Sequence, residues 1–144
     1  MTHTSSSPLA VGFLGGSLTS AVGRVHQVAV AMDRRFTLQA GCFSQEPDMN
    51  RETAHAYGVE PSRTYDNLES MLAAESKRLD AIVILTPTNK HGEHVLACIN
   101  AGMPVICEKA LTHSTAELTK IKNALEQTGG FLTVTYNYLG YPML

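Results

Sequence analysis

The chain has 144 residues, 44% hydrophobic and 17% charged, a composition that indicates one globular domain and excludes a disordered or fibrous protein. Its net charge of −2 gives no positive field that would gather nucleic acid or an anionic membrane, and no apolar run approaches the roughly 18 residues of a membrane-spanning helix. The polar residues 1–8 predict a disordered tail without a secretory signal, and Cys42, Cys98 and Cys107 form no Cys-x-x-Cys pair, so we expect a cytoplasmic protein with reduced core thiols and no metal site.

Short apolar runs alternate with helical stretches along the chain, and this alternation is typical of βαβ units on a parallel sheet. Strands are expected at 9–14, 38–43, 81–85, 104–107 and 131–136, and helices at 21–34, 47–57, 67–77, 91–101 and 115–128. No linker or repeat interrupts this order. The sequence therefore predicts a single-domain α/β fold, a doubly wound parallel sheet (Rossmann fold) with helices on both faces.

Local signals add detail to three of the helices. Asp66 with Glu69, and Ser114 with Glu117, have the spacing of capping boxes, which predicts where two helices begin. One face of the helix over 21–34 is apolar, with Val22, Val25, Ala29 and Met32.

A glycine- and serine-rich turn follows the first strand. In a doubly wound fold the ligand lies at the carboxyl ends of the strands, where the strand order reverses beside the first strand. A pyrophosphate there needs glycine, because it approaches the backbone closely, and a helix N-terminus with free N–H groups. The turn supplies both, through Gly12, Gly15, Gly16, Ser17, Thr19, Ser20 and Gly23. Its spacing is longer than Gly-x-Gly-x-x-Gly and Ser17 replaces one glycine, so a purely structural turn is the alternative.

Three later segments also fall at the carboxyl ends of predicted strands: Thr-Pro-Thr-Asn-Lys-His over 86–91, Glu-Lys-Ala over 108–110, and Tyr-Asn-Tyr-Leu-Gly-Tyr-Pro over 136–142. Together with the glycine turn, in this order and spacing, they resemble the glucose–fructose oxidoreductase/inositol dehydrogenase (Gfo/Idh/MocA) family. The resemblance covers the chain from Val11 to Leu144. It implies an oxidoreductase that uses NAD(H) or NADP(H), usually on a sugar, cyclitol or related polyol.

The resemblance also implies roles residue by residue. The turn over 15–22, with Ala21 and Val22 at its end, would hold the pyrophosphate. Lys109 would reach the oxygen of the reacting carbon and is the candidate catalytic residue. The other residues implied to contact the cofactor are Thr86, Pro87, Asn89 and His91 along the path from adenosine to nicotinamide, Glu108 at the nicotinamide ribose, and Asn137 near the nicotinamide.

The residue types themselves support Lys109 and leave His91 open. An amine beside a cationic nicotinamide ring suits proton exchange with an alcohol as hydride leaves. Because Lys109 follows a strand at its carboxyl end, we favour this role over that of a solvated loop lysine. His91 either contacts the cofactor or simply occupies the first turn of its helix. His94 and Cys98, further along that helix, are interpreted as packing or surface residues rather than metal ligands.

The sequence departs from the family pattern in two places. Ala110 stands where the family usually has proline, so the backbone that aims Lys109 is expected to be less rigid. NAD enzymes typically have Asp or Glu after the second strand, to bind the ribose 2′-hydroxyl, whereas Ser44 and Gln45 stand here. We therefore expect Ser44 to contact the ribose, NAD or NADP to be the cofactor, and NADP to bind at least as well as NAD.

Two other classes of protein share a glycine-rich first turn. A non-catalytic nucleotide-binding or redox-sensing module would have no need of Lys109. An adenosyl-methionine methyltransferase would have an acid after the second strand, and none stands at Ser44 or Gln45. Both alternatives are less favoured than the oxidoreductase.

The resemblance finally implies a second domain. In the family an aspartate and histidine pair of that domain completes the catalytic machinery, and the same domain makes most substrate contacts and the oligomer. We therefore expect 9–144 to be the NAD(P)-binding domain and the C-terminal substrate domain to be absent from this chain. The chain alone should be inactive, and the full-length protein should be a homo-oligomer that acts on a sugar or polyol.

Overall fold

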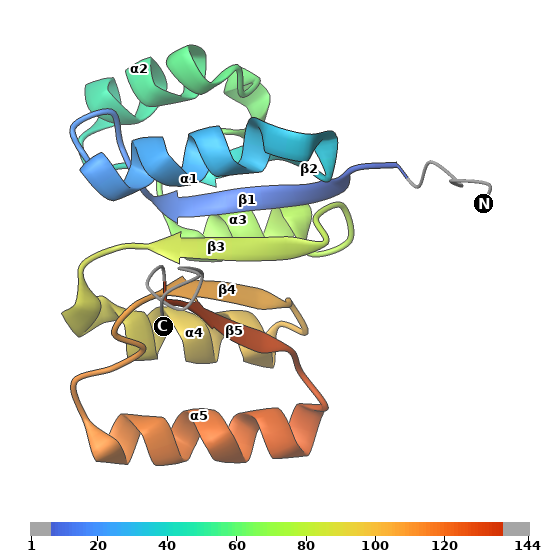
Figure 1. The fold of residues 1–144 in the computed structure, drawn as a ribbon, viewed down its shortest axis with the longest axis vertical. Coiled ribbons are helices and arrows are strands. Elements are labelled where there is room, and N and C mark those ends of the chain that lie inside the picture. Colours follow the sequence, from blue (N-terminus) through green and yellow to red (C-terminus); the bar gives the residue numbers. More distant parts are fainter. Residues whose placement is uncertain (1–6, 137–144) are drawn as a thin grey trace, which may run out of the picture.

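Five short apolar runs form one parallel sheet in the computed structural model, which describes residues 7–136 (Figure 1). The strands are β1 (Leu9–Gly15), β2 (Phe36–Cys42), β3 (Ala81–Leu85), β4 (Val105–Glu108) and β5 (Leu132–Thr135). Their order in the sheet is β2-β1-β3-β4-β5, so the order reverses beside β1. This topology confirms the predicted Rossmann fold and brings the carboxyl ends of the strands to one edge.

The two central strands are apolar because both of their faces are covered. Val11 and Phe13 of β1, and Ile82 and Ile84 of β3, have no exposed surface. Their side chains alternate between two hydrophobic cores, one on each face of the sheet.

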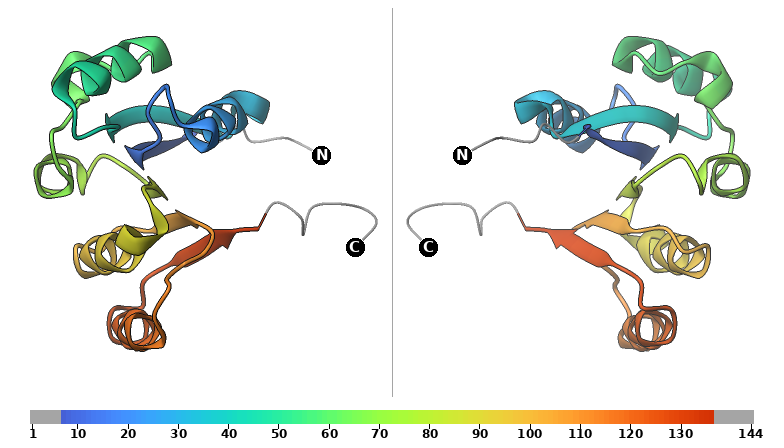
Figure 2. Two further views of the ribbon diagram at one scale, coloured as in Figure 1. Left: turned by 90° about the vertical axis from the view of Figure 1, so that its left-hand side faces the viewer. Right: turned by 90° about the vertical axis from the view of Figure 1, so that its right-hand side faces the viewer.

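Three helices cover one face of the sheet: α3 (Leu68–Glu75), α4 (Thr88–Asn100) and α5 (Thr115–Thr128). The opposite face carries α1 (Ala21–Ala31), and α2 (Pro47–Tyr57) lies along the β2 edge (Figure 2). None of these helices within residues 7–136 is long and apolar enough to span a membrane.

The helix ends follow local chemistry, with one correction. Ser114 begins α5 as predicted, because its side chain accepts a hydrogen bond from the amide three residues on. The predicted capping box of Asp66 and Glu69 is wrong, since Asn67 is the N-cap of α3 and accepts from the amide of Ser70. Asp and Asn are equally good N-caps, so composition alone does not decide between neighbouring positions.

α1 turns its apolar stripe away from the sheet. The face predicted from the sequence is exposed, at Val22, Val25, Ala29 and Met32. The helix packs instead through Gly23, which is buried, and through His26, whose ring meets the edge of Phe13 on β1. The residue without a side chain faces inward because helix and turn approach closely there.

The α1 side of the sheet is covered unevenly. On that side helices cover β1 and β2, whereas no helix of the described residues covers β4 and β5 (Figure 2). A groove of about 220 Å³ runs between α1 and β4, lined by Val11, His26, Ala29, Val30, Phe36, Val83, Ile106 and Thr135. The prediction of helices on both faces is confirmed, and on the α1 side the described helices cover only the β2 half of the sheet.

Glu75 of α3 is a buried carboxylate with a full set of partners. The Arg63 side chain donates to both of its oxygens, at 2.9 Å and 2.5 Å, and the Tyr65 hydroxyl donates at 2.8 Å. The hydrogen bonds from Arg63 hold the pKa of Glu75 below its usual range, against the opposing effect of burial, and Tyr65 adds to this. These hydrogen bonds connect α3 to Arg63 and Tyr65, in the segment beside β2.

The three cysteines are free and buried. Burial raises the pKa of the Cys98 and Cys107 thiols to about 12. Thiols that stay protonated are poor nucleophiles, so these side chains act as packing residues.

Candidate functional site

The turn after β1 approaches the end of β3 more closely than a side chain would allow. Gly15 has φ 83° and Gly16 has φ 78°, in the left-handed region that favours glycine. A Cβ added to Gly15 would lie 2.9 Å from the Leu85 carbonyl carbon and 2.9 Å from the Thr86 amide nitrogen. The two glycines therefore let the main chain cross the carboxyl edge beside β3.

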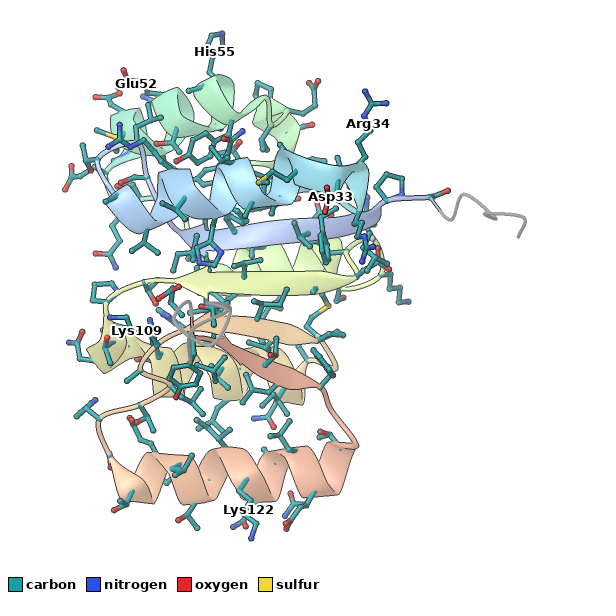
Figure 3. The ribbon with its side chains drawn as sticks, in the orientation of Figure 1. Asp33, Arg34, Glu52, His55, Lys109 and Lys122 are labelled. Carbon is teal, nitrogen blue, oxygen red and sulfur yellow. The ribbon has the colours of Figure 1, made fainter. Side chains whose placement is uncertain are left out.

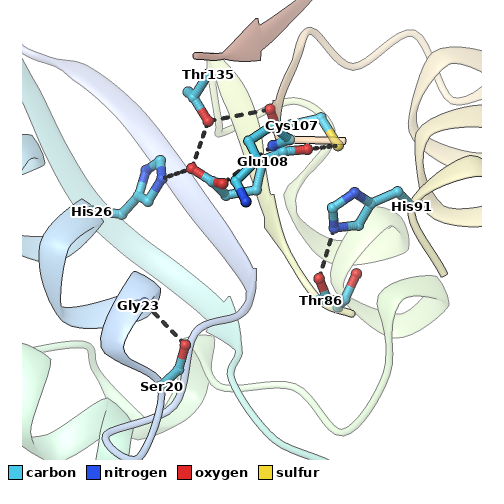
Figure 4. Close-up of polar contacts among 9 residues, drawn as sticks. Ser20, Gly23, His26, Thr86, His91, Cys107, Glu108 and Thr135 are labelled. Carbon is cyan, nitrogen blue, oxygen red and sulfur yellow. Dashed lines mark hydrogen bonds and ion pairs between the residues drawn. The ribbon is translucent and has the colours of Figure 1, made fainter. Parts of the chain in front are cut away.

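The same turn opens α1 with unpaired amides. Ser20 is the N-cap, and its hydroxyl accepts from the Gly23 amide at 3.1 Å (Figure 4). Ala21 and Val22 occupy the first two positions of the helix, whose amides have no intrahelical partner. These amides and the positive end of the helix dipole make a site for an anion.

At Gly23, α1 packs directly against the main chain of the glycine turn. A Cβ at Gly23 would lie 2.2 Å from the Gly16 carbonyl oxygen, so only glycine fits. By contrast, Gly12, a predicted cofactor residue, lies in the middle of β1, where a Cβ would meet the Leu79 side chain at 2.7 Å. Gly12 is a packing residue of the sheet and lies outside the turn.

Side chains of α2 support this turn, and sequence reasoning missed them. Thr53 accepts from the Leu18 amide at 3.2 Å, and the Tyr57 hydroxyl donates to the Gly16 carbonyl at 3.1 Å. These pairs are 35 and 41 residues apart in the chain. No local pattern signals such contacts. Ser17, a predicted contact of the pyrophosphate, lies in the same turn, where its hydroxyl pairs with Thr19 at 3.1 Å.

Ser44 lies two residues beyond the end of β2, where the ribose was expected. Its hydroxyl accepts from the Glu46 amide at 3.1 Å, so it is already part of the loop into α2. Arg51, in the following helix, is paired with Asp48, so its guanidinium is already engaged with a carboxylate.

The segment after β3 is organised by two histidines. α4 begins at Thr88, three residues before the predicted start, so Asn89 and His91 lie in its first turn. His91 is 1% exposed, with Nε2 2.6 Å from the Thr86 carbonyl oxygen and Nδ1 2.8 Å from that of Ala110. Its ring therefore joins the loops after β3 and β4, and both ring nitrogens face main chain.

The other residues predicted after β3 lie at the same edge. Pro87 and Asn89 are exposed, and Thr86 is half-buried. The Thr86 hydroxyl pairs with His94 Nδ1 at 3.0 Å, and burial lowers the pKa of His94. His94 thus has a packing role, as the sequence predicted.

Glu108 is held by three elements at the end of β4. Its Oε1 accepts from Thr135 Oγ1 at 2.7 Å and lies 3.0 Å from His26 Nε2, while its Oε2 accepts from the Lys109 amide at 3.2 Å (Figure 4). Burial opposes ionisation of Glu108, but the hydrogen bonds from His26 and Thr135 outweigh it and hold its pKa below the usual range. The carboxylate predicted at the nicotinamide ribose thus already has protein partners.

Lys109 follows at the carboxyl edge of the sheet and is exposed (Figure 3). The peptide bond between Lys109 and Ala110 is cis. The glycine turn, the segment after β3 and Lys109 therefore share one edge of the sheet, as predicted from their places after successive strands. Asn137, the remaining predicted contact, lies outside the described residues.

Within residues 7–136 no three His, Cys, Asp or Glu side chains converge as metal ligands would. A hollow of about 470 Å³, larger than the groove beside α1, lies beside α2 and the loop that follows it. It is lined by Asn50, Arg51, Ala54, His55, Gly58, Val59, Glu60, Pro61, Thr64 and Asp66.

Comparison with known proteins matches residues 9–136 to the model of the oxidoreductase family with an NAD-binding Rossmann fold, GFO_IDH_MocA. The uncharacterized oxidoreductase YfiI of Bacillus subtilis is 36% identical over 143 residues, which cover 96% of this chain and 36% of that protein. Inositol 2-dehydrogenase 4 of Saccharopolyspora erythraea is 30% identical over 116 residues, 81% of this chain and 32% of that enzyme.

A solved structure has the same fold. The inositol dehydrogenase homologue of Azotobacter vinelandii, complexed with NADH and myo-inositol, superposes with a TM-score of 0.90 at 29% identity. The match covers 96% of this chain and 37% of that one. The chain thus spans about a third of the length of these relatives.

Proposed function

This chain belongs to the Gfo/Idh/MocA oxidoreductase family, whose Rossmann domain binds NAD, and we propose that it is the cofactor-binding part of an enzyme that transfers hydride between a nicotinamide dinucleotide and a sugar, cyclitol or related polyol. One observation carries the proposal. The glycine turn that exposes the N-terminus of α1 and the lysine that follows β4 lie at the same edge of the sheet.

The glycine turn would hold the diphosphate through main-chain amides. Gly15 and Gly16 let the turn pass close to the end of β3, and the amides of Ala21 and Val22, at the start of α1, would donate to the diphosphate oxygens. The two halves of a dinucleotide lie on either side of the point where the strand order reverses. Ser44, beyond β2, would therefore contact the adenosine half, and Lys109, beyond β4, the nicotinamide half.

Lys109 is the proposed proton-transfer group. When bound, the nicotinamide ring accepts or donates the hydride. As an alcohol carbon loses hydride, its hydroxyl oxygen must also lose a proton, and the neutral amine of Lys109 would accept it. In the reverse direction the ammonium would return the proton to the carbonyl oxygen. Glu108 holds the Lys109 amide in place, and Asn137 is proposed to contact the nicotinamide.

The remainder of the full-length protein is proposed to hold the substrate. Hydride transfer needs the substrate carbon about 3–3.5 Å from the ring, and such positioning supplies about 7–11 kcal/mol of a barrier. The relatives are almost three times as long as their match to this chain. We propose that their additional residues, and those of this protein, supply the substrate contacts and the oligomer interface.

Two measurements test the proposal. The chain is titrated with NADH and NADPH, following the emission of the reduced nicotinamide; saturable binding of at least one is expected. Full-length protein with Lys109→Met is then compared with wild type on a panel of inositols and hexoses. The variant should bind cofactor normally and lose turnover. Absence of binding would refute the cofactor role, binding without turnover by full-length wild type would favour the redox-sensing module, and turnover by the variant would refute the role of Lys109.

A further inference from the structure

We infer that α2 sets the shape of the two loops that would hold the dinucleotide, through the side chains of Asn50, Thr53 and Tyr57. The inference rests on the proposed function, because it assigns these residues a positioning role in cofactor binding. None of the three would need to touch the cofactor.

The three residues lie on one face of α2, at positions i, i+3 and i+7. Asn50 is 2% exposed and Thr53 has no exposed surface. A buried amide or hydroxyl is costly unless its hydrogen bonds are made, so the partners of these groups are fixed by the fold. Glu52 and His55 belong to the outer face and are exposed (Figure 3).

Two of these residues, Thr53 and Tyr57, make hydrogen bonds to the main chain of the glycine turn. Thr53 Oγ1 accepts from the Leu18 amide at 3.2 Å, and the Tyr57 hydroxyl donates to the Gly16 carbonyl at 3.1 Å. The Tyr57 hydrogen bond thus helps to fix the orientation of the Gly16 peptide, whose carbonyl oxygen also lies against Gly23 in the first turn of α1. Burial raises the pKa of Tyr57, against a lowering effect of Arg24, so its hydroxyl keeps the proton that it donates.

The third residue holds the loop after β2. Asn50 Oδ1 accepts from the Phe43 amide at 2.8 Å, and Asn50 Nδ2 donates to the Tyr65 carbonyl at 2.9 Å. The ring of Tyr57 also meets Phe43 edge-on, with 5.7 Å between ring centroids. One face of α2 therefore connects the glycine turn with the loop that carries Ser44.

A rigid helix face that fixes both loops removes conformational freedom before the cofactor arrives. Binding then costs less ordering entropy, so affinity is higher than for two independent loops. The turn between Gly16 and Ser20 is longer than a Gly-x-Gly-x-x-Gly turn, and such a turn has more freedom to lose. The α2 contacts compensate for this length.

The inference is tested by cofactor affinity in matched variants. Thr53→Val keeps the shape of the side chain and removes the acceptor for the Leu18 amide, and Tyr57→Phe removes only the donor to Gly16. Each lost hydrogen bond should weaken NADH binding about three- to tenfold. Thr53→Ser, which keeps the hydroxyl, and Glu52→Gln, on the outer face of α2, should bind as wild type does.

Amide hydrogen exchange provides the second readout, since it needs no cofactor. The Leu18 amide should be protected in wild type and in Thr53→Ser, and should exchange faster in Thr53→Val while amides of the central strands keep their protection. Unchanged affinity and unchanged Leu18 exchange in Thr53→Val would overturn the inference while leaving the proposed function intact. A wild-type chain that binds neither NADH nor NADPH would refute the proposed function and this inference with it.

Discussion

Replacing Gly23 with alanine adds one methyl group at the contact between α1 and the glycine turn. The new Cβ would lie 2.2 Å from the carbonyl oxygen, 2.5 Å from the carbonyl carbon and 2.6 Å from the Cα of Gly16. Non-bonded atoms prefer separations of about 3.5 Å, so helix and turn must separate by about 1 Å. All three contacts are with main chain, so no side-chain rotation relieves them.

The expected cost falls mainly on cofactor binding. Alanine is intrinsically better than glycine inside a helix by about 1 kcal/mol, which offsets part of the roughly 1–3 kcal/mol of overpacking. The free energy of unfolding should therefore fall by about 0–2 kcal/mol. A displaced turn, however, misaligns the amides of Ala21 and Val22, and a hydrogen bond to a charged group contributes about 1.5–3 kcal/mol. Loss of one such bond raises the Kd for NADH roughly ten- to a hundredfold.

The assay is a titration with NADH, together with thermal unfolding of the variant. The chain has no tryptophan, so reduced-nicotinamide emission is measured without an overlapping indole signal. Gly92→Ala is the matched control, because the three atoms nearest to its Cβ, the closest at 2.7 Å, belong to the Glu117 side chain rather than to main chain. If Gly23→Ala binds NADH as tightly as Gly92→Ala does, the turn does not hold the diphosphate and the reasoning fails.

Three further predictions concern other parts of the molecule. Ser44→Asp should shift preference towards NAD, because a carboxylate accepts from the 2′-hydroxyl and repels a 2′-phosphate; an unchanged ratio of the two Kd values would contradict this. Glu75→Gln should lower the free energy of unfolding by about 3 kcal/mol, since it leaves the Arg63 guanidinium without its counter-charge. Because the pKa of Glu75 is lowered on folding, its contribution is present above the unfolded pKa and is lost as pH falls through the folded one; denaturant titrations from neutral to acid pH should show a smaller loss in the variant. Finally, this chain alone should bind cofactor without oxidising any inositol or hexose, and steady formation of reduced cofactor would show that Lys109 needs no further domain.

The strands and the edge that carries the site were predictable because their signals are local. β3 is a continuous apolar run, as a strand buried on both faces must be, and it was predicted with the bounds observed. The positions of Gly15 and Lys109 follow directly, since parallel strands place their carboxyl ends together. The order of the strands in the sheet has no local signal of its own, and it follows from the Rossmann fold.

The contacts that shape the site were not predictable, because they join residues far apart in the chain. His26 and Glu108 are 82 residues apart, and Thr53 and Leu18 are 35 apart. The apolar stripe of α1 failed as a guide for a different reason. Hydrophobic periodicity identifies the apolar face of a helix. The face of α1 that meets the sheet is instead set by the close approach of Gly23 to the Gly16 main chain, and glycine has no side chain to contribute to the apolar pattern.

The hydrogen bonds of Glu108 connect the α1 side of the sheet to Lys109. His26 and Thr135, which line the groove between α1 and β4, both pair with Oε1 of Glu108, and Oε2 accepts from the Lys109 amide. A displacement of the Glu108 carboxylate would therefore also move the main chain from which the Lys109 side chain extends.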